Sequence, residues 1–308
     1  MSALGNDLVV ATEYICNFRG GSQPILVQAN DGLLYVVKFT NNLQGPNVPF
    51  NESMGSELYR ACGLAALSWK PVMITDSFLD RNPKCWMQTP EGRLRPAPGL
   101  CFGSRFLGMT GVRLREILPA ASYKRVRNRD SFWLAWLIDI CAGHVDNRQA
   151  IFVEDSSGWL DAFFVDHGHI FGGPDGKDLR HFCASRYLDS RIYANISLRE
   201  TLGFLRVVQS LDADQLWRRL HAIPAEWRRA SAMERFVACL QTLSKPALLQ
   251  HVFEAIIDVQ ARRTERELGD PRSEGKRPAA VLCPGVRGRT ASPSSALAAR
   301  CSGHLACA

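Results

Sequence analysis

Two aspartates at the ends of a short predicted hairpin constrain this chain more than any other feature. Residues 150–153 and 161–165 predict two strands, and a glycine-containing turn at residues 155–158 joins them. Antiparallel strands return the chain to its starting point, so Asp146 and Asp166 should lie near each other. Two neighbouring carboxylates repel, and one would take up a proton unless a cation joins them. A Mg²⁺ ion, which prefers carboxylate and amide oxygens, would remove that cost.

The segments around both aspartates are polar and rich in glycine. Residues 146–149 read Asp-Asn-Arg-Gln, and residues 166–169 read Asp-His-Gly-His. Either aspartate alone would be explained as a loop cap or as a strand end in solvent. The pair, flanked by glycines at positions 143, 168, 172 and 173, instead predicts a functional site at the mouth of the hairpin.

A second feature is a lysine inside an apolar stretch. Lys38 lies near the end of residues 33–39, which predict a strand that is otherwise apolar on both faces. A lysine in that place needs a partner or a route to water, and snorkelling at the strand edge would supply the route. A carboxylate on the following helix, predicted from Asn51 as the capping residue to about residue 62, would supply the partner. Glu52 and Glu57 are the two candidates.

A glycine-rich turn precedes this lysine. Gly20, Gly21, Ser22 and Gln23 stand between two predicted strands, at residues 12–18 and 24–29. Glycines let backbone N–H groups approach phosphates closely, although most Gly-Gly turns are only turns. The order of the features carries more information than the turn itself. A glycine-rich turn, a strand with lysine and a helix with glutamate follow one another as in the small lobe of protein kinases.

The rest of the chain completes a two-part organisation. Residues 71–74 predict another strand, and residues 99–107 predict an apolar connection interrupted by glycine. Helices are expected at residues 113–118 and 130–141, and from residue 198 to about 259 with a break at Ile223-Pro224. We therefore expect an α+β, two-lobed, protein-kinase-like fold with a ligand cleft between the lobes. Its expected parts are a β-rich N-lobe (residues 1–103), a mainly helical C-lobe (104–262) and a disordered basic tail (263–308).

Charge and composition narrow the partners. The formal net charge is +7, but from Arg262 onward nine basic and four acidic residues carry +5 of it. A nearly balanced folded part argues against nucleic acid as a partner. No apolar run could cross a bilayer and the N-terminus shows no signal peptide, so we expect a cytoplasmic protein without a membrane partner. The ten cysteines are scattered without a Cys-x-x-Cys pair, so we expect no structural zinc site.

These motifs together resemble the HipA-like kinases, an atypical branch of the protein-kinase-like fold. The similarity covers roughly residues 12–173, and the region around Ile223-Pro224-Ala225-Glu226-Trp227 also resembles the C-terminal part of that family. The tail after about residue 263 does not. The matching pieces occur in the order of the family and comprise residues 19–23, 35–39, 42, 44–45, 51–52, 63–64, 102–105, 143–149 and 165–168.

The resemblance implies a phosphotransferase that uses ATP and Mg²⁺. It would transfer the γ-phosphoryl group to a hydroxyl, with a protein as the expected acceptor and serine or threonine as the expected acceptor residue. Catalysis would then depend on positioning and charge neutralisation. On this resemblance, Gly20, Gly21, Ser22 and Gln23 would cover the phosphates. Lys38, held by Glu52, would contact the α- and β-phosphates, while Phe102 and Ser104 would lie at the adenine-side hinge. Asp146 would orient or deprotonate the hydroxyl, and Asp166 would bind Mg²⁺.

One departure from the family affects the metal site. HipA-like kinases carry an Asn five residues after the catalytic Asp, whereas Ile151 stands there in this chain. The loop is shorter by two residues, which leaves Gln149 as the second metal ligand and Asn147 as the alternative, since both amides offer a carbonyl oxygen. A nucleotide-binding pseudokinase or regulatory module without turnover is therefore the main alternative. A metal-dependent hydrolase using His144, Asp166, His167 and His169 is a further one.

Overall fold

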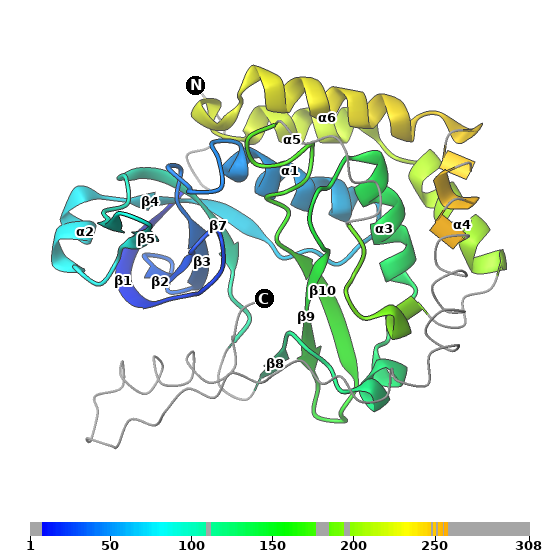
Figure 1. Ribbon diagram of the computed structural model, residues 1–308, viewed down its shortest axis with the longest axis horizontal. Coiled ribbons are helices and arrows are strands. Elements are labelled where there is room, and N and C mark those ends of the chain that lie inside the picture. The colour runs from blue at the N-terminus through cyan, green and yellow to red at the C-terminus, as the bar shows by residue number, and fades with distance from the viewer. Residues whose placement is uncertain are drawn as a thin grey trace.

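The chain folds into a strand-rich N-terminal part and a mainly helical C-terminal part (Figure 1). The computed structural model describes residues 8–108, 112–176, 185–193, 198–247, 249–250, 252–254 and 256–257. This arrangement confirms the predicted two-lobed α+β fold. Among the described residues, no helix combines the length and the apolar character that crossing a membrane requires.

The N-terminal part is a closed five-stranded barrel. Its strands follow the order β1-β2-β3-β7-β4, and a parallel pairing of β1 with β4 closes it. Closure leaves no free strand edge, and inward side chains such as Val27, Val37 and Val72 fill the interior. The barrel strands are β1 (Val9–Asn17), β2 (Ile25–Ala29), β3 (Leu34–Lys38), β4 (Trp69–Ile74) and β7 (Gly99–Arg105).

Strand β7 corrects the prediction that residues 99–107 connect the lobes. The segment is a central strand, paired with β3 on one side and with β4 on the other. Its glycine serves close packing, because a Cβ atom at Gly103 would lie 2.3 Å from Cγ2 of Val72. The strand continues through Arg105, so the chain leaves the barrel only after that residue.

Helix α1 (Val48–Ala61) begins earlier than the sequence predicts. Asn47 precedes it and Pro49 lies in its first turn, where the missing N–H of proline has no cost. The prediction that Asn51 caps this helix is therefore wrong. Most residues of α1 are buried, because the helix lies between the barrel and the helices α3, α5 and α6 (Figure 1). This burial on several sides places polar as well as apolar side chains of α1 in the interior.

The C-terminal part contains the predicted hairpin, and its strands pair in regular antiparallel register from Gln149↔Val165 to Glu154↔Leu160. Helix α3 confirms the prediction at residues 130–141. The predicted helix at residues 113–118 is wrong, because Arg113–Arg115 forms strand β8, which pairs with β9 and places Arg115 2.8 Å from Glu154. The elements of this part are β8 (Arg113–Arg115), η2 (Ala120–Arg125), α3 (Ser131–Cys141), β9 (Gln149–Glu154), β10 (Leu160–Val165), η3 (Ser190–Tyr193), α4 (Leu198–Gln209), α5 (Ala213–Ala222), η4 (Ala225–Trp227) and α6 (Ala230–Leu243).

Small elements complete the N-terminal part: α2 (Asp76–Arg81), β5 (Met87–Thr89) and β6 (Gly92–Leu94), the last two forming a separate hairpin. The segment 263–308 lies outside the described residues, so the disordered basic tail stays a prediction. The division at residues 103 and 262 stays a prediction as well.

Candidate active site

Three charged side chains from distant segments meet between the two parts of the chain. Lys38 at the end of β3 forms an ion pair with Glu52 of α1, and its Nζ lies 2.6 Å from Oδ1 of Asp166, just after β10. Lys38 and Glu52 are buried. Of the two candidate partners the structure selects Glu52, because Glu57 instead bonds with Arg60 and with Nε1 of Trp69.

The electrostatics of this cluster favour the charged forms of Lys38 and Asp166. Burial opposes the charge on Lys38, but the carboxylates of Asp166 and Glu52 outweigh it and raise the pKa of the lysine above its ordinary value. Burial also acts to raise the pKa of Asp166, yet the adjacent Lys38 ammonium holds that pKa well below its usual range. One ammonium therefore faces two carboxyl groups, of which Asp166 is held in its ionised form and so could bind a cation.

Glu52 also fixes the loop that follows Asp166. Burial raises the pKa of Glu52, whereas Lys38 and the backbone N–H of His167 oppose that rise. Its carboxylate accepts hydrogen bonds from the N–H groups of His167 and Gly168, each at 3.0 Å. Gly168 permits this approach, since a Cβ atom there would lie 3.1 Å from Oε1 of Glu52. Asp166 itself adopts a φ of 59°, a left-handed conformation that is uncommon outside glycine and depends on its surroundings.

Asn51 has a role that the sequence did not predict. Its buried Nδ2 donates to the carbonyl oxygens of Gly168 at 2.9 Å, Ile170 at 2.8 Å and Gly173 at 3.2 Å. Two neighbouring residues of α1 thus hold the backbone of the Asp166 loop. The sequence signal for this contact is a pair of adjacent polar residues, Asn51 and Glu52, within a helix that is mostly buried.

Asp146 lies at the mouth of the hairpin, as predicted. Its segment contacts the Asp166 loop through a hydrogen bond from the N–H of Val145 to the carbonyl oxygen of His169, at 3.1 Å. The side chain of Asp146 is partly exposed and accepts from the N–H of Asn147 at 2.7 Å. Gln149 pairs with Val165 in the ladder, one residue before Asp166. The hairpin therefore brings together the segments that contain both predicted carboxylates and both candidate amide ligands.

The glycine-rich turn reaches the same loop through Gln44. Nδ2 of Asn42 donates to the carbonyl oxygen of Ser22 at 3.1 Å, and a Cβ atom at Gly21 would lie 2.6 Å from Nε2 of Gln44. Nε2 of Gln44 in turn lies 2.9 Å from Nε2 of His169. Gly20, with a φ of 115°, gives the turn its shape. The turn thus lies next to the loop that carries Asp166, although the two are far apart in sequence.

Three predicted residues lie less directly in the site. The side chain of Gln23 bonds with the backbone of Gln88 in β5, at 2.6 and 2.8 Å, so it serves the packing of the turn. Phe102 is buried in β7, where it pairs with Lys38 and packs against Trp69. Ser104 lies two residues further along the same strand. Phe102 belongs to the hydrophobic core of the C-terminal part and so faces away from the barrel interior, and the contact of Phe102 and Ser104 with an adenine ring stays a prediction.

The donor atoms near Asp166 are oxygens, which suit a hard divalent cation. Among the described residues, no three His, Cys, Asp or Glu side chains converge as metal ligands. Nδ1 of His144 contacts the carbonyl oxygen of Asp146, while the ring of His167 packs against Tyr59. These residues do not form the centre that the hydrolase alternative requires. Oxygen ligands suit Mg²⁺, which takes one or two carboxylates and fills its shell with phosphate and water, so Asp166 with an amide from Gln149 or Asn147 fits that ion.

The buried histidines predict a loss of stability in mild acid. Burial lowers the pKa of His144 to about 4, and burial beside Arg148 holds the pKa of His167 well below its ordinary value. Both imidazoles therefore protonate more readily in the unfolded chain, whose histidines titrate near pH 6.5. The stability that they contribute is complete above that pH and is lost as the pH falls towards 4. We expect the free energy of unfolding, measured by urea titration, to be lower by about 2 kcal/mol or more at pH 5 than at pH 7.5.

The control for this prediction is His221→Asn, since His221 is exposed on α5 and should leave the pH profile unchanged. Equal stability at the two pH values would contradict the assignment of neutral, buried imidazoles.

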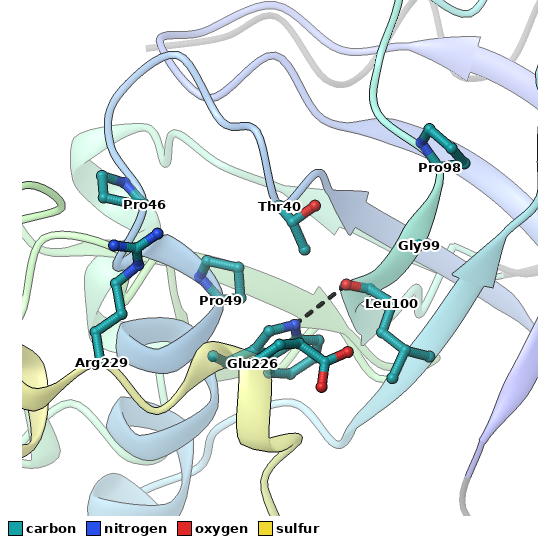
Figure 2. A pocket seen from close by; sticks show the side chains of 9 residues that line it. Thr40, Pro46, Pro49, Pro98, Gly99, Leu100, Glu226 and Arg229 are labelled. Carbon is teal, nitrogen blue, oxygen red and sulfur yellow. Dashed lines mark hydrogen bonds between the residues drawn. The ribbon is translucent and has the colours of Figure 1, made fainter.

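A surface pocket of about 270 Å³ lies at the junction of α1, β7 and η4 (Figure 2). Nε1 of Trp227 donates to the carbonyl oxygen of Leu100 at 3.1 Å and so ties η4 to the barrel. The pocket contains none of the predicted site residues. Its lining consists of Thr40, Pro46, Pro49, Pro98, Gly99, Leu100, Glu226, Trp227 and Arg229.

Solved kinase structures are similar to this chain in fold. One is a Helicobacter pylori proinflammatory kinase, CtkA, with 14% identity over 80% of this chain and 93% of that chain, at a TM-score of 0.46. Another is the Golgi casein kinase, with 14% identity over 83% of this chain and 73% of that chain, also at 0.46. The same kinase with Mn/ADP bound gives a TM-score of 0.44 at 14% identity, over 82% of this chain and 74% of that chain. No protein-family model matches the chain, and no curated protein matches its sequence.

Proposed function

We propose that this protein is a HipA-like kinase that uses ATP and Mg²⁺ to phosphorylate a hydroxyl, with a serine or threonine of a protein as the acceptor. The observation that carries the proposal is the buried Lys38, which lies between Glu52 of α1 and Asp166 after the hairpin. A lysine held by a helix glutamate beside a metal-binding aspartate is the arrangement that protein kinases use for phosphoryl transfer. It is assembled here from three segments that are remote in sequence.

The residues of the chain then have distinct roles in the reaction. Lys38 contacts the α- and β-phosphates, and its charge is kept by the two carboxylates beside it. Backbone N–H groups of the turn at Gly20 and Gly21 face the phosphates. Asp166, with the amide of Gln149 or Asn147, would hold Mg²⁺, which neutralises phosphate charge when bound. Phe102 and Ser104 of β7 would lie on the adenine side.

Asp146 is assigned to the acceptor. It lies at the hairpin mouth and is partly exposed, so a hydroxyl from another molecule can approach it. A carboxylate in that place orients the hydroxyl and accepts its proton as the bond to phosphorus forms. The neighbouring N–H of Asn147, which donates to Oδ1 of Asp146, fixes the direction of the carboxylate.

A nucleotide-binding pseudokinase is the second candidate. The observation in its favour is that Gln149, the candidate second metal ligand, lies at the start of β9 and pairs with Val165, while Ile151 stands where the family carries its Asn. A misplaced second ligand would weaken transfer more than nucleotide binding, because the phosphates are also held by Lys38 and the glycine-rich turn.

The two candidates separate in one experiment. The protein is incubated with Mg²⁺ and ATP labelled at the γ-phosphate, and the protein and a cell lysate are then examined by mass spectrometry. Labelled serine or threonine supports the kinase, and nucleotide binding without any transferred label supports the pseudokinase. A protein that binds no nucleotide in calorimetry contradicts both.

Replacing Asp146 with asparagine should separate binding from transfer. The variant keeps the shape of the side chain but removes its ability to accept a proton, a loss that typically costs about 10²- to 10⁴-fold in rate. Asp146 is assigned to the acceptor and not to the nucleotide. We therefore expect the Kd of the variant for ATP with Mg²⁺ to stay within about twofold of the wild-type value. The matched control is Asp80→Asn, on the exposed ion pair with Arg95. Normal transfer by the Asp146 variant would remove this residue from the acceptor role.

A further inference from the structure

An ion pair that is almost completely buried lies beneath the proposed site. Asp139, on α3, and Arg148, two residues after Asp146, have side-chain exposures of 0% and 1%. The guanidinium binds the carboxylate with two hydrogen bonds, Nη2 to Oδ1 at 2.6 Å and Nε to Oδ2 at 2.8 Å. This forked geometry is the strong form of an arginine–carboxylate contact, and it fixes the orientation of both side chains.

The third nitrogen of the same guanidinium contacts the backbone that leads into Asp166. Nη1 of Arg148 donates to the carbonyl oxygen of Val165 at 3.0 Å, and it lies 3.5 Å from that of Asp166 and 3.3 Å from Nδ1 of His167. Arg148 therefore ties the segment of Asp146 to the residues on both sides of Asp166. The contact falls where the backbone of Asp166 takes its left-handed conformation.

Helix α1 joins the same cluster through Tyr59. Its hydroxyl donates to Oδ1 of Asp139 at 2.6 Å, and its ring lies under the guanidinium of Arg148, with 4.9 Å between Cζ and the ring centroid. The ring of His167 packs against Tyr59 with 4.6 Å between centroids. The three elements that carry Glu52, Asp146 and Asp166 thus meet at one charged centre in the core.

Stability alone gives a poor reason for charges in this position. Removing two charges from water is costly, and buried ion pairs are often replaced by apolar residues of similar volume without loss of stability. The pair has a second consequence that apolar residues could not reproduce, because only a multivalent donor holds the carboxylate and the carbonyl oxygen of Val165 together.

We infer that Arg148, with Asp139 as its counter-ion, is a positioning residue that sets the backbone of Asp166 relative to Asp146. The inference rests on the proposed function in one respect, namely that Asp166 binds the metal. Without Arg148, the left-handed turn at Asp166 loses its contact at the Val165 carbonyl, and the carboxylate is no longer held towards Lys38.

The test removes both charges together, so that neither is left buried alone. The double variant Arg148→Met with Asp139→Leu is compared with Arg127→Gln with Asp161→Asn, which removes an exposed pair between the segment before α3 and strand β10. Hydrogen exchange of the His167 and Gly168 amides reports the position of the loop without any ligand. Calorimetry gives the Kd for ATP with and without Mg²⁺.

We expect the double variant to be folded, with exchange at the His167 and Gly168 amides at least tenfold faster and with unchanged exchange in the barrel strands. Its Kd for metal-free ATP should equal that of wild type, while the improvement brought by Mg²⁺ should be lost. If the double variant does not fold, Arg148→Lys keeps the charge and should show about threefold faster exchange, because a single ammonium cannot satisfy both partners.

Wild-type exchange at these amides in a folded variant would overturn the inference. A different outcome is faster exchange at these amides in the double variant together with no effect of Mg²⁺ on ATP binding by wild type. That outcome would reject the proposed metal site and retain Arg148 as the residue that holds the loop. A metal effect that persists in the double variant, despite faster exchange, would also overturn the positioning role.

Discussion

Asp166→Ala should abolish Mg²⁺-dependent turnover of ATP while the chain remains folded. The carboxylate of Asp166 is the one cluster member that we assign to the metal, and metal coordination contributes several kcal/mol to stabilising the charge that develops on phosphate. A loss of that size corresponds to a rate reduction of about 10³-fold or more. The measurements are the release of ADP and the transfer of label, together with the Kd for ATP with and without Mg²⁺.

The fold should survive this change because Lys38 keeps Glu52 as its partner. The control is Asp161→Ala, which removes a carboxylate from the same strand region but on the surface, where Asp161 pairs with Arg127 at 2.8 Å. An Asp166→Ala protein that transfers phosphate at the wild-type rate would show that this carboxylate holds no essential metal.

The parts of the site that the sequence predicted follow from local rules. The hairpin is visible in the sequence because its two apolar strands enclose a turn of the usual kind, and hairpin geometry then places Asp146 and Asp166 at the same end. The partner of Lys38 could be limited to Glu52 or Glu57 because a buried lysine needs a carboxylate. The choice between them needed the structure, since it depends on how α1 lies against the barrel.

The parts that the sequence missed depend on contacts between remote segments. Asn51 was assigned to a helix cap because asparagine favours that position, but tertiary contacts with the carbonyl oxygens of Gly168, Ile170 and Gly173 decide its role. The glycine-interrupted segment 99–107 predicts a connection between the lobes, whereas Gly103 lies within β7 and allows close packing against Val72 of β4.

Asp139 shows the same limit in the core. It interrupts the apolar run of α3, which is a visible signal, but nothing local indicates that Arg148 completes it. This pairing is a property of the assembled fold, because Asp139 lies on α3 and Arg148 lies directly before β9.

Lys38→Met should remove transfer and also destabilise the protein. Methionine retains the length of the side chain but leaves Glu52 and Asp166 facing each other without the ammonium between them. Breaking a buried ion pair by removal of one partner typically costs about 3–5 kcal/mol, because a charge remains buried without compensation. The free energy of unfolding from urea titration measures this loss. The control is Lys70→Met, on the more exposed pair with Asp31, where a loss of at most about 1 kcal/mol is expected.

A second variant separates the electrostatic cause from the loss of packing. In Lys38→Met with Asp166→Asn, one of the two uncompensated carboxylates becomes a neutral amide of the same shape, so part of the stability should return. Transfer should stay absent, because the metal-binding carboxylate and the phosphate-binding ammonium are both missing. If the double variant were no more stable than Lys38→Met alone, repulsion between Glu52 and Asp166 would not be the cause, and the charge assignment of the cluster would be wrong.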